Sequence, residues 1–157
     1  MKRPALLDVN VLIALFDPGH VHHEPAHDWF AEESTNGWAT CPLTELAFVR
    51  ILSNPALGPD PERPLTLLRH LRQFCKSTDH VFWTDTLSLR DEKVFDLAFA
   101  SHRQLTDVYL LGLAHKKGGR LATFDRTIPV KAVVGAHSGV VQIISPVESQ
   151  SLSPTSH

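Results

Sequence analysis

Four acidic side chains stand where strand-like segments give way to helix-like segments, and they constrain this chain more than any other feature. They are Asp8, Glu45, Asp107 and Asp125. Asp8 and Asp125 each follow an apolar run, whereas Glu45 and Asp107 each open one. A carboxylate inside a hydrophobic frame is costly unless a cation compensates its charge. The pattern therefore indicates one shared charged site and disfavours four unrelated surface acids.

Short apolar runs alternate with helical patterns along the chain. We expect strands at residues 5–9, 38–41, 81–83, 120–124 and 140–145, and helices at residues 11–16, 22–34, 42–52, 65–74, 91–100 and 105–115. Thr106 is the expected N-cap of the last helix, and Gly118 and Gly119 are expected to end it. Strands that alternate with helices favour an α/β fold, in which helices cover both faces of a parallel sheet.

The position of the four acids within such a fold brings them to one edge. Ligands of parallel sheets bind beyond the carboxyl ends of the strands, where Asp8 and Asp125 are expected. Glu45 and Asp107 fall in the first turns of helices, where the positive end of the helix dipole tolerates a negative charge. We therefore expect all four carboxylates within about one metal-coordination shell of each other.

Four neighbouring carboxylates need a counter-charge. Two of them about 4 Å apart repel by roughly 4 kcal/mol at an effective dielectric constant of about 20. Hard oxygen ligands select Mg²⁺ or Mn²⁺ and not zinc, which prefers histidine or cysteine. The chemistry that follows is hydrolysis of a phosphodiester by metal-activated water. For Glu45 or Asp107 taken alone, a simple interaction with the helix dipole remains the alternative.

Length and composition bound the remaining possibilities. At 157 residues the chain is expected to form one domain, residues 1–146, followed by a disordered tail rich in serine, residues 147–157. The formal net charge of −2 does not mark a nucleic-acid binder, so any such contact depends on local patches. Two cysteines and no apolar run of about 20 residues predict a soluble cytoplasmic protein with no place in a membrane.

The segments LLDVNVLIAL, TELAFVRIL, LTDVYLLGLA and LATFDR, in this order, resemble the PIN domain of the VapC-like toxin ribonucleases. The resemblance runs from about residue 5 to residue 145. It implies a three-layer α/β/α fold with a central parallel sheet and an endoribonuclease that depends on Mg²⁺ or Mn²⁺. The family's acidic positions fall on Asp8, Glu45, Asp107 and Asp125, which would be both catalytic residues and metal ligands.

The same resemblance assigns supporting positions and partners. Asn10 matches a polar residue that steadies the first aspartate, and Thr123 matches a small hydroxyl residue before the last acid. The segments around His20 and Arg50 are also similar to VapC. An RNA substrate, a cognate VapB-like antitoxin and a homodimer are implied as partners. The sequence does not indicate which RNA is cut.

Two other interpretations use the same residues. Asp8 also resembles the covalent nucleophile of haloacid-dehalogenase-type phosphatases, but these enzymes need a second aspartate where this chain has Asn10. A non-catalytic binding domain would be expected to lack one or more of the acids. His23 and His27, one helical turn apart, allow a zinc site, although exposed helix residues are the simpler explanation. The reaction product discriminates among the enzymes, because a phosphatase releases phosphate and a ribonuclease releases RNA fragments.

Overall fold

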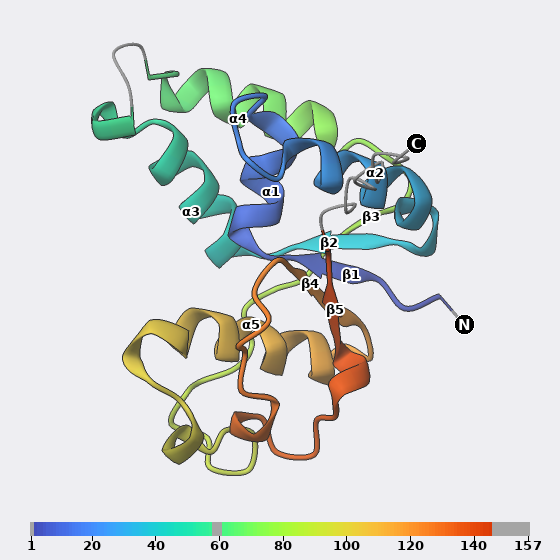
Figure 1. Ribbon diagram of the computed structural model, residues 1–157, viewed down its shortest axis with the longest axis vertical. Coiled ribbons are helices and arrows are strands. Elements are labelled where there is room, and N and C mark those ends of the chain that lie inside the picture. Colours follow the sequence, from blue (N-terminus) through green and yellow to red (C-terminus); the bar gives the residue numbers. More distant parts are fainter. Residues whose placement is uncertain (1, 58–60, 146–157) are drawn as a thin grey trace, which may run out of the picture.

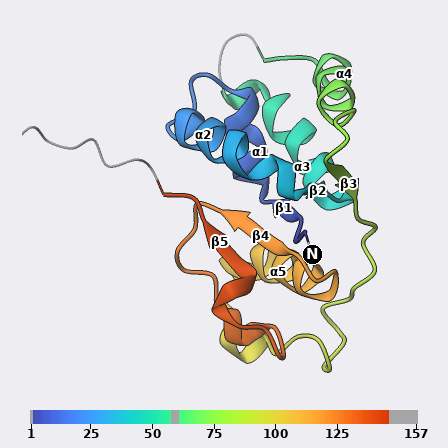
Figure 2. The same cartoon turned by 90° about the vertical axis from the view of Figure 1, so that its right-hand side faces the viewer.

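A five-stranded parallel sheet forms the centre of the molecule in the computed structural model, which describes residues 2–57 and 61–145. The strand order is β3-β2-β1-β4-β5, and each neighbouring pair is parallel (Figures 1 and 2). The strands are β1 (Ala5–Leu7), β2 (Trp38–Thr40), β3 (His80–Phe82), β4 (Arg120–Thr123) and β5 (Val141–Ile143). The expected parallel sheet is confirmed, and the tail expected at residues 147–157 lies outside the described residues.

Helices cover the two faces of this sheet unequally. Four helices lie on one face and one on the other (Figure 1): α1 (Val9–Phe16), α2 (His23–Glu33), α3 (Pro42–Leu52) and α4 (Pro64–Phe74) against α5 (Leu105–Lys116). Successive residues of β1 alternate between the two layers: Ala5 and Leu7 belong to the core with α1–α4, and Leu6 belongs to the core with α5. The fold is therefore the expected three-layer α/β/α arrangement.

None of the helices within the described ranges has the length and apolar character needed to cross a lipid bilayer.

Local signals explain the start of α3 and the end of α5. Pro42 occupies the first turn of α3, and the Cys41 backbone N–H donates to the Thr44 hydroxyl 3.0 Å away. Gly118, with a φ of 69°, lies just after α5 in the left-handed region that favours glycine. The expected Thr106 cap is wrong, because α5 already begins at Leu105.

The helix expected at residues 91–100 is also wrong. The segment instead forms turns, an isolated antiparallel bridge between Phe95 and Val133, and a short 3-10 helix, η3 (Leu97–Phe99). Phe95 is buried against Gly112 of α5, so closely that a Cβ on Gly112 would lie 2.5 Å from the Phe95 ring. A tertiary contact thus overrides the helical spacing of the apolar residues.

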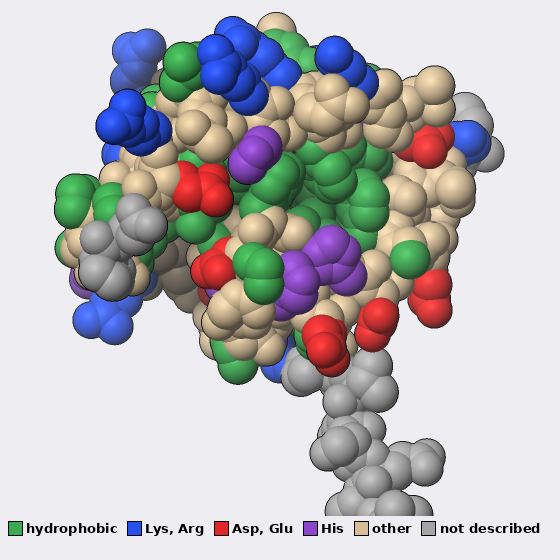
Figure 3. Space-filling model, turned by 90° about the horizontal axis from the view of Figure 1, so that it is seen from above, with side chains coloured by type: hydrophobic (Ala, Val, Ile, Leu, Met, Phe, Trp, Pro, Cys, Tyr) green, Lys and Arg blue, Asp and Glu red, His purple; other side chains and the backbone are tan. Residues whose placement is uncertain are grey.

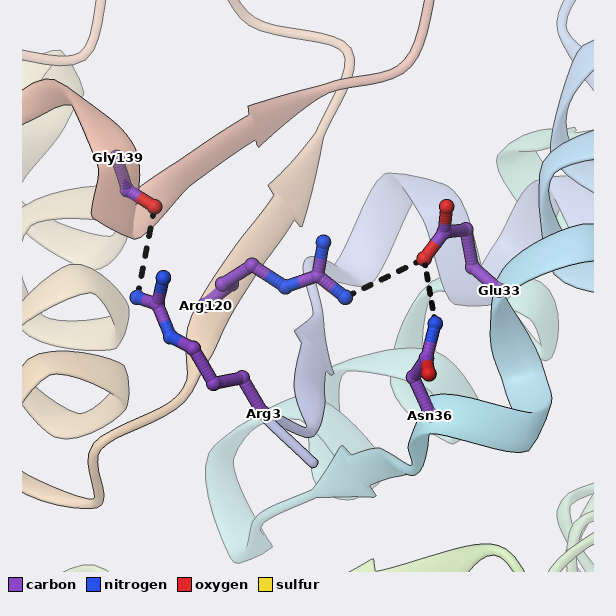
Figure 4. Close-up of polar contacts among 5 residues, drawn as sticks. All are labelled: Arg3, Glu33, Asn36, Arg120 and Gly139. Carbon is purple, nitrogen blue, oxygen red and sulfur yellow. Dashed lines mark hydrogen bonds and ion pairs between the residues drawn. The ribbon is translucent and has the colours of Figure 1, made fainter. Parts of the chain in front are cut away.

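A group of polar contacts joins segments near the amino ends of β1 and β4 (Figure 4). The Arg120 guanidinium lies 3.4 Å from the Glu33 carboxylate, which also accepts a hydrogen bond of 3.1 Å from Asn36. The Arg3 guanidinium donates to the carbonyl of Gly139 at 3.5 Å. These contacts hold β4 and α2 together at the amino end of β4, and the carboxyl ends of the strands remain available for a site.

The path of the chain creates a switch point between β1 and β4. From β1 the chain proceeds outward through β2 and β3, and then returns to place β4 on the other side of β1. Connections leave the neighbouring carboxyl ends of β1 and β4 in different directions, which opens a crevice there. Asp8 follows β1 directly, and Asp125 lies two residues beyond β4.

Candidate active site

Asp8 is the most deeply buried acid at the switch point between β1 and β4. It immediately precedes α1, and only 5% of its surface is exposed. The hydroxyl of Thr123, a buried residue of β4, donates to Asp8 Oδ2 at 2.9 Å, and the same oxygen of Thr123 accepts the Asp125 backbone N–H at 3.1 Å. Thr123 therefore links the first and last of the four acids.

Burial raises the pKa of Asp8 above its ordinary value. The Thr123 hydrogen bond and the backbone amides of Val9 and Asn10 act against this shift, and the charge of Asp125 adds to it. The raised pKa means that burial disfavours the charged form of Asp8 more than these hydrogen bonds favour it.

Asp107 reaches the same place from the opposite face of the sheet. It lies in the first turn of α5, and its pKa is raised to about 7. Burial is the largest cause, followed by the negative charges of Asp8 and Asp125 and by a hydrogen bond with Asp125 that requires a proton. Like charges held close together in a partly buried site raise the pKa of a carboxyl group in this way.

Asp125 is fixed by the turn that follows it. Its Oδ1 accepts the backbone N–H and the hydroxyl of Thr127, at 2.7 and 2.6 Å. The three aspartates share a cavity of about 440 Å³, whose lining is completed by the loop after α1 and by residues next to the acids: Asn10, His20, Val21, His22 and Phe124.

Glu45 is directed elsewhere. It lies in the first turn of α3, and its Oε2 accepts the hydroxyl of Thr40, the last residue of β2, at 2.6 Å. Its carboxylate lies beside the side chains of Cys75 and His80 and does not line the cavity of the three aspartates. The structure thus brings together three of the four expected acids. Glu45 is held one strand away because Thr40 offers it a hydrogen-bond donor.

The distances also distinguish the two groups of side chains. Among the described residues, the three side chains whose ligand atoms all lie within 4.8 Å of one another are Glu45, Cys75 and His80, not the three aspartates. The aspartates therefore share a cavity without forming a closed coordination shell.

Of the supporting residues expected from the sequence, Asn10 and His20 line the cavity and Arg50 does not. Asn10 is exposed at the edge of the cavity, and its backbone amide faces Asp8. His20 lines the cavity, and its Nδ1 accepts the His22 backbone N–H at 3.0 Å. Burial, the largest cause, lowers the pKa of His20 and favours its neutral form. Arg50 is exposed on the last turn of α3, outside the cavity.

Two aromatic side chains beside the acids were missed by sequence reasoning. The rings of His22 and Phe124 stack with their centroids 4.5 Å apart at the cavity. The position of Phe124, between the Thr123 and Asp125 already noted, was the signal that could have identified it. Stacked aromatic rings at the edge of an acidic cavity suit the flat face of an unpaired base.

The histidine pair at one-turn spacing has a structural role. A ring nitrogen of His23 lies 2.6 Å from the Ala14 carbonyl oxygen, and one of His27 lies 2.7 Å from that of Leu15. Since a carbonyl only accepts, both rings donate and satisfy the free carbonyls at the end of α1. These contacts replace the zinc site considered from the sequence.

The family is established by comparison with known proteins. The family model for the PIN domain matches residues 5–133 of this chain. The chain therefore belongs to the PIN domain family, as its sequence segments indicated.

Individual relatives identify the branch of that family. Ribonuclease VapC39 of Mycobacterium tuberculosis is 44% identical over 132 residues, which cover 83% of this chain and 95% of the relative. Ribonuclease VapC44 of the same organism is 44% identical over 133 residues, covering 84% and 93%. Ribonuclease VapC38 is 44% identical over 127 residues, covering 77% and 84%. The chain is thus a VapC-type PIN domain along most of its length.

Proposed function

We propose that this protein is the toxin of a VapBC-type toxin–antitoxin pair and that it acts as an endoribonuclease. The observation that carries the proposal is the group of three aspartates at the β1–β4 switch point of a VapC-type PIN domain. Two of these aspartates, Asp8 and Asp107, have raised pKa values, as is common for groups at functional sites.

The cavity fits a hard divalent cation such as Mg²⁺ or Mn²⁺. Its charged donors are carboxylate oxygens from Asp8, Asp107 and Asp125, which are the ligands that such ions prefer. Burial and neighbouring carboxylates raise the pKa values of Asp8 and Asp107, and a bound cation would favour the charged forms of both. When bound, the ion would lower the pKa of a water molecule and neutralise charge on the phosphate.

The protein's own residues have separate tasks in this proposal. Thr123 holds the Asp8 carboxylate in place, and the turn at Thr127 orients Asp125. The His22 and Phe124 rings offer a stacking surface for a base next to the scissile phosphate, and His20 stands beside them. Arg50 lies outside the cavity, and its proposed role is to contact the phosphates of RNA that extends beyond it.

Glu45 can join the three aspartates only after it gives up its hydrogen bond with Thr40. Its carboxylate would have to leave the Thr40 hydroxyl and rotate toward the three aspartates. A glutamate has three rotatable side-chain bonds, and Glu45 is only half-buried, so its carboxylate is free to change rotamer. We therefore assign Glu45 as a ligand that joins the site when the cation and RNA bind.

Asp8→Asn tests the proposed function most directly. The change keeps the shape of the side chain and removes its charge, so cleavage of RNA in Mg²⁺ should fall by roughly 10²–10³-fold or more. Excess EDTA should stop the wild-type protein, and the products should be RNA fragments without free inorganic phosphate. Cleavage that persists in EDTA, or release of phosphate from small phosphomonoesters, would contradict the assignment.

Asp8→Asn also provides the reagent for finding the RNA. A variant that binds without cutting can be crosslinked to cellular RNA, and the retained fragments can be sequenced. The control is the charge-reversed variant Asp8→Lys. An RNA class that Asp8→Asn retains in greater amount than Asp8→Lys would be identified as the substrate. The cytoplasm is the proposed site of action, because both the RNA and a newly made antitoxin are found there.

A second surface is suited to the antitoxin or to a second copy of the chain. A groove between α1, α3 and α4 has an apolar floor that includes Phe16, Leu52 and Leu67, with Asp17 and Glu62 at its edge. Figure 3 looks onto this side of the molecule and shows apolar side chains gathered in a hollow, with histidine and acidic groups around it. An amphipathic antitoxin segment with cationic residues would match both features.

We propose that the antitoxin inhibits by placing an arginine or lysine beside Asp8 and Asp107. A guanidinium matches two carboxylates and would compete with the metal. Changing that arginine to alanine in an antitoxin peptide should weaken inhibition, and salt should weaken inhibition by the unchanged peptide, because screening acts over about 8–10 Å. Undiminished inhibition by the alanine peptide would place the inhibitor elsewhere. A sedimentation measurement of the toxin alone tests the homodimer.

A further inference from the structure

Three side chains at the β2–β3 edge of the sheet form a second polar cluster. Glu45 comes from α3, Cys75 follows α4 directly, and His80 begins β3. The ligand atoms of all three lie within 4.8 Å of one another, and each residue is half-buried, so an ion can reach them from solvent. The cluster is separate from the cavity of the three aspartates.

The donor types differ from those of the aspartate cavity. A thiolate, an imidazole and a carboxylate are the ligands of zinc and similar transition metals, whereas Mg²⁺ prefers oxygen alone. In a tetrahedral zinc site the ligand atoms lie roughly 3.3–3.8 Å apart, given bond lengths of about 2.0–2.3 Å. Separations of up to 4.8 Å need to close by up to about 1.5 Å, which small rotations of the Glu45, Cys75 and His80 side chains can supply.

The three side chains are already aimed at one point, which the hydroxyl of Thr40 occupies. Thr40 Oγ1 lies 2.6 Å from Glu45 Oε2 and 2.8 Å from His80 Nε2, and it also contacts the Cys75 thiol. Thr40 is fully buried at the end of β2, so this point is fixed by the sheet. A cation bound by these side chains would replace their contacts to this hydroxyl and lie on the side where Glu45, Cys75 and His80 are partly exposed.

Packing also fixes the imidazole. The His80 ring lies 4.5 Å, centroid to centroid, from that of Trp38, which is completely buried. The His80 Nε2 lies 2.8 Å from the Thr40 hydroxyl, which fixes the direction of this nitrogen. Its Nε2 becomes free as a ligand when the proton moves to Nδ1.

We propose that Glu45, Cys75 and His80 bind a thiophilic transition-metal ion of the zinc class, with water at the fourth position. On binding, the Cys75 thiol loses its proton to solvent and the sulfur forms the bond to the metal.

Occupancy of this site has a consequence that rests on the proposed ribonuclease function. Glu45 is the acid that we assign to the aspartate cavity in the active state. A zinc-class ion that holds Glu45 beside Cys75 and His80 keeps it away from Asp8. Zinc therefore inhibits from outside the cavity, and does so without displacing Mg²⁺.

Cobalt(II) binding to the full chain tests the site without any reference to RNA. Bonding of cobalt to a thiolate gives a charge-transfer absorption band in the near ultraviolet, which carboxylate and histidine sites do not give. The wild-type protein, freed of metal by a chelator, should show this band, and added zinc should remove it. Cys75→Ser should abolish the band and His80→Ala should weaken cobalt binding at least tenfold.

Controls separate this site from others in the chain. His102→Ala changes an exposed histidine elsewhere and should leave the band unchanged. The buried Cys41 remains in the Cys75→Ser variant, so a band that persists there would assign the thiolate to Cys41 and overturn the proposal. Absence of a band in the wild-type protein would overturn it as well. Circular dichroism and Tm of each variant show that the fold is retained.

A second measurement isolates the regulation. With Mg²⁺ in excess, the zinc concentration that halves RNA cleavage is measured for each protein relative to its own zinc-free rate. Cys75→Ser should need at least tenfold more zinc than wild type. Equal sensitivity would overturn the regulatory role. If the wild-type protein binds cobalt through Cys75 but cuts no RNA with Mg²⁺, the metal site stands and the proposed ribonuclease function fails.

Discussion

Asp107 and Glu45 occupy equivalent places on the two faces of the sheet, yet their surroundings are opposite. Each lies in the first turn of a helix, α5 or α3, where the helix dipole favours a negative charge. Glu45 receives the Thr40 hydroxyl, whereas Asp107 faces the charges of Asp8 and Asp125 and has its pKa raised to about 7. The comparison shows that the facing residues, and not the position in the helix, determine the electrostatics of an acid.

The largest expected difference between the two acids is in catalysis. Asp107→Asn should lower RNA cleavage in Mg²⁺ by about 10²–10³-fold, because Asp107 lies in the cavity in the resting structure. Glu45→Gln should lower it less, by about 10–100-fold, because Glu45 joins the site only after leaving Thr40. Single-turnover cleavage rates measure both effects. Equal losses would remove the distinction between the two acids.

The second largest expected difference between Asp107 and Glu45 is in the pH dependence of stability. Between pH 4 and about 7 the folded protein binds a proton at Asp107 that the unfolded chain has released, so the free energy of unfolding falls as pH rises through this range. In EDTA, the Tm of the wild-type protein should fall by several degrees from pH 5 to pH 8 relative to the Tm of Asp107→Asn.

Mg²⁺ provides the matching control for that measurement. At pH 8 the ion should raise the Tm of the wild-type protein, because it binds the folded state alone, and should raise the Tm of Asp107→Asn less. Parallel pH profiles for wild type and Asp107→Asn would show that Asp107 is not the residue that links proton binding to folding.

The smallest expected effect concerns Thr40, whose hydroxyl donates a hydrogen bond to Glu45. Thr40→Val removes the buried hydroxyl between Glu45 and His80 and should lower the free energy of unfolding by about 1–2 kcal/mol. Urea unfolding measures the change. Thr106→Val, at an exposed threonine of α5, is the matched control and should have little effect. If Thr40→Val leaves the free energy of unfolding unchanged, this contact does not hold Glu45.

The sequence predicted the sheet and the aspartate group because both depend on local patterns. Apolar runs of strand length marked all five strands, and the path of a parallel α/β chain then required Asp8 and Asp125 to lie at adjacent strand ends. Asp107 followed from the start of an apolar helix. These features need only residue type, spacing and the general rules of sheet topology.

The misses share a different cause, which is contact between distant residues. Glu45 was expected beside Asp8, but no local pattern reveals that Glu45 and His80, which is 40 positions after Thr40, converge on the Thr40 hydroxyl. The helix expected around Phe95 fails because this side chain fits against the glycine surface of α5 at Gly112. His22 and Phe124 come together across the cavity from separate loops. Such pairs become visible only in three dimensions.

The hydrogen bond between Thr123 and Asp8 spans 115 residues, and this has a consequence for the synthesis of the protein. A chain still emerging from the ribosome contains Asp8 long before β4 exists to pair with β1. Until then the first aspartate lacks its anchor, and both Asp107 and Asp125 arrive late as well. We therefore expect that a chain that ends before β4 cuts no RNA, because it lacks Asp125 and the Thr123 anchor of Asp8.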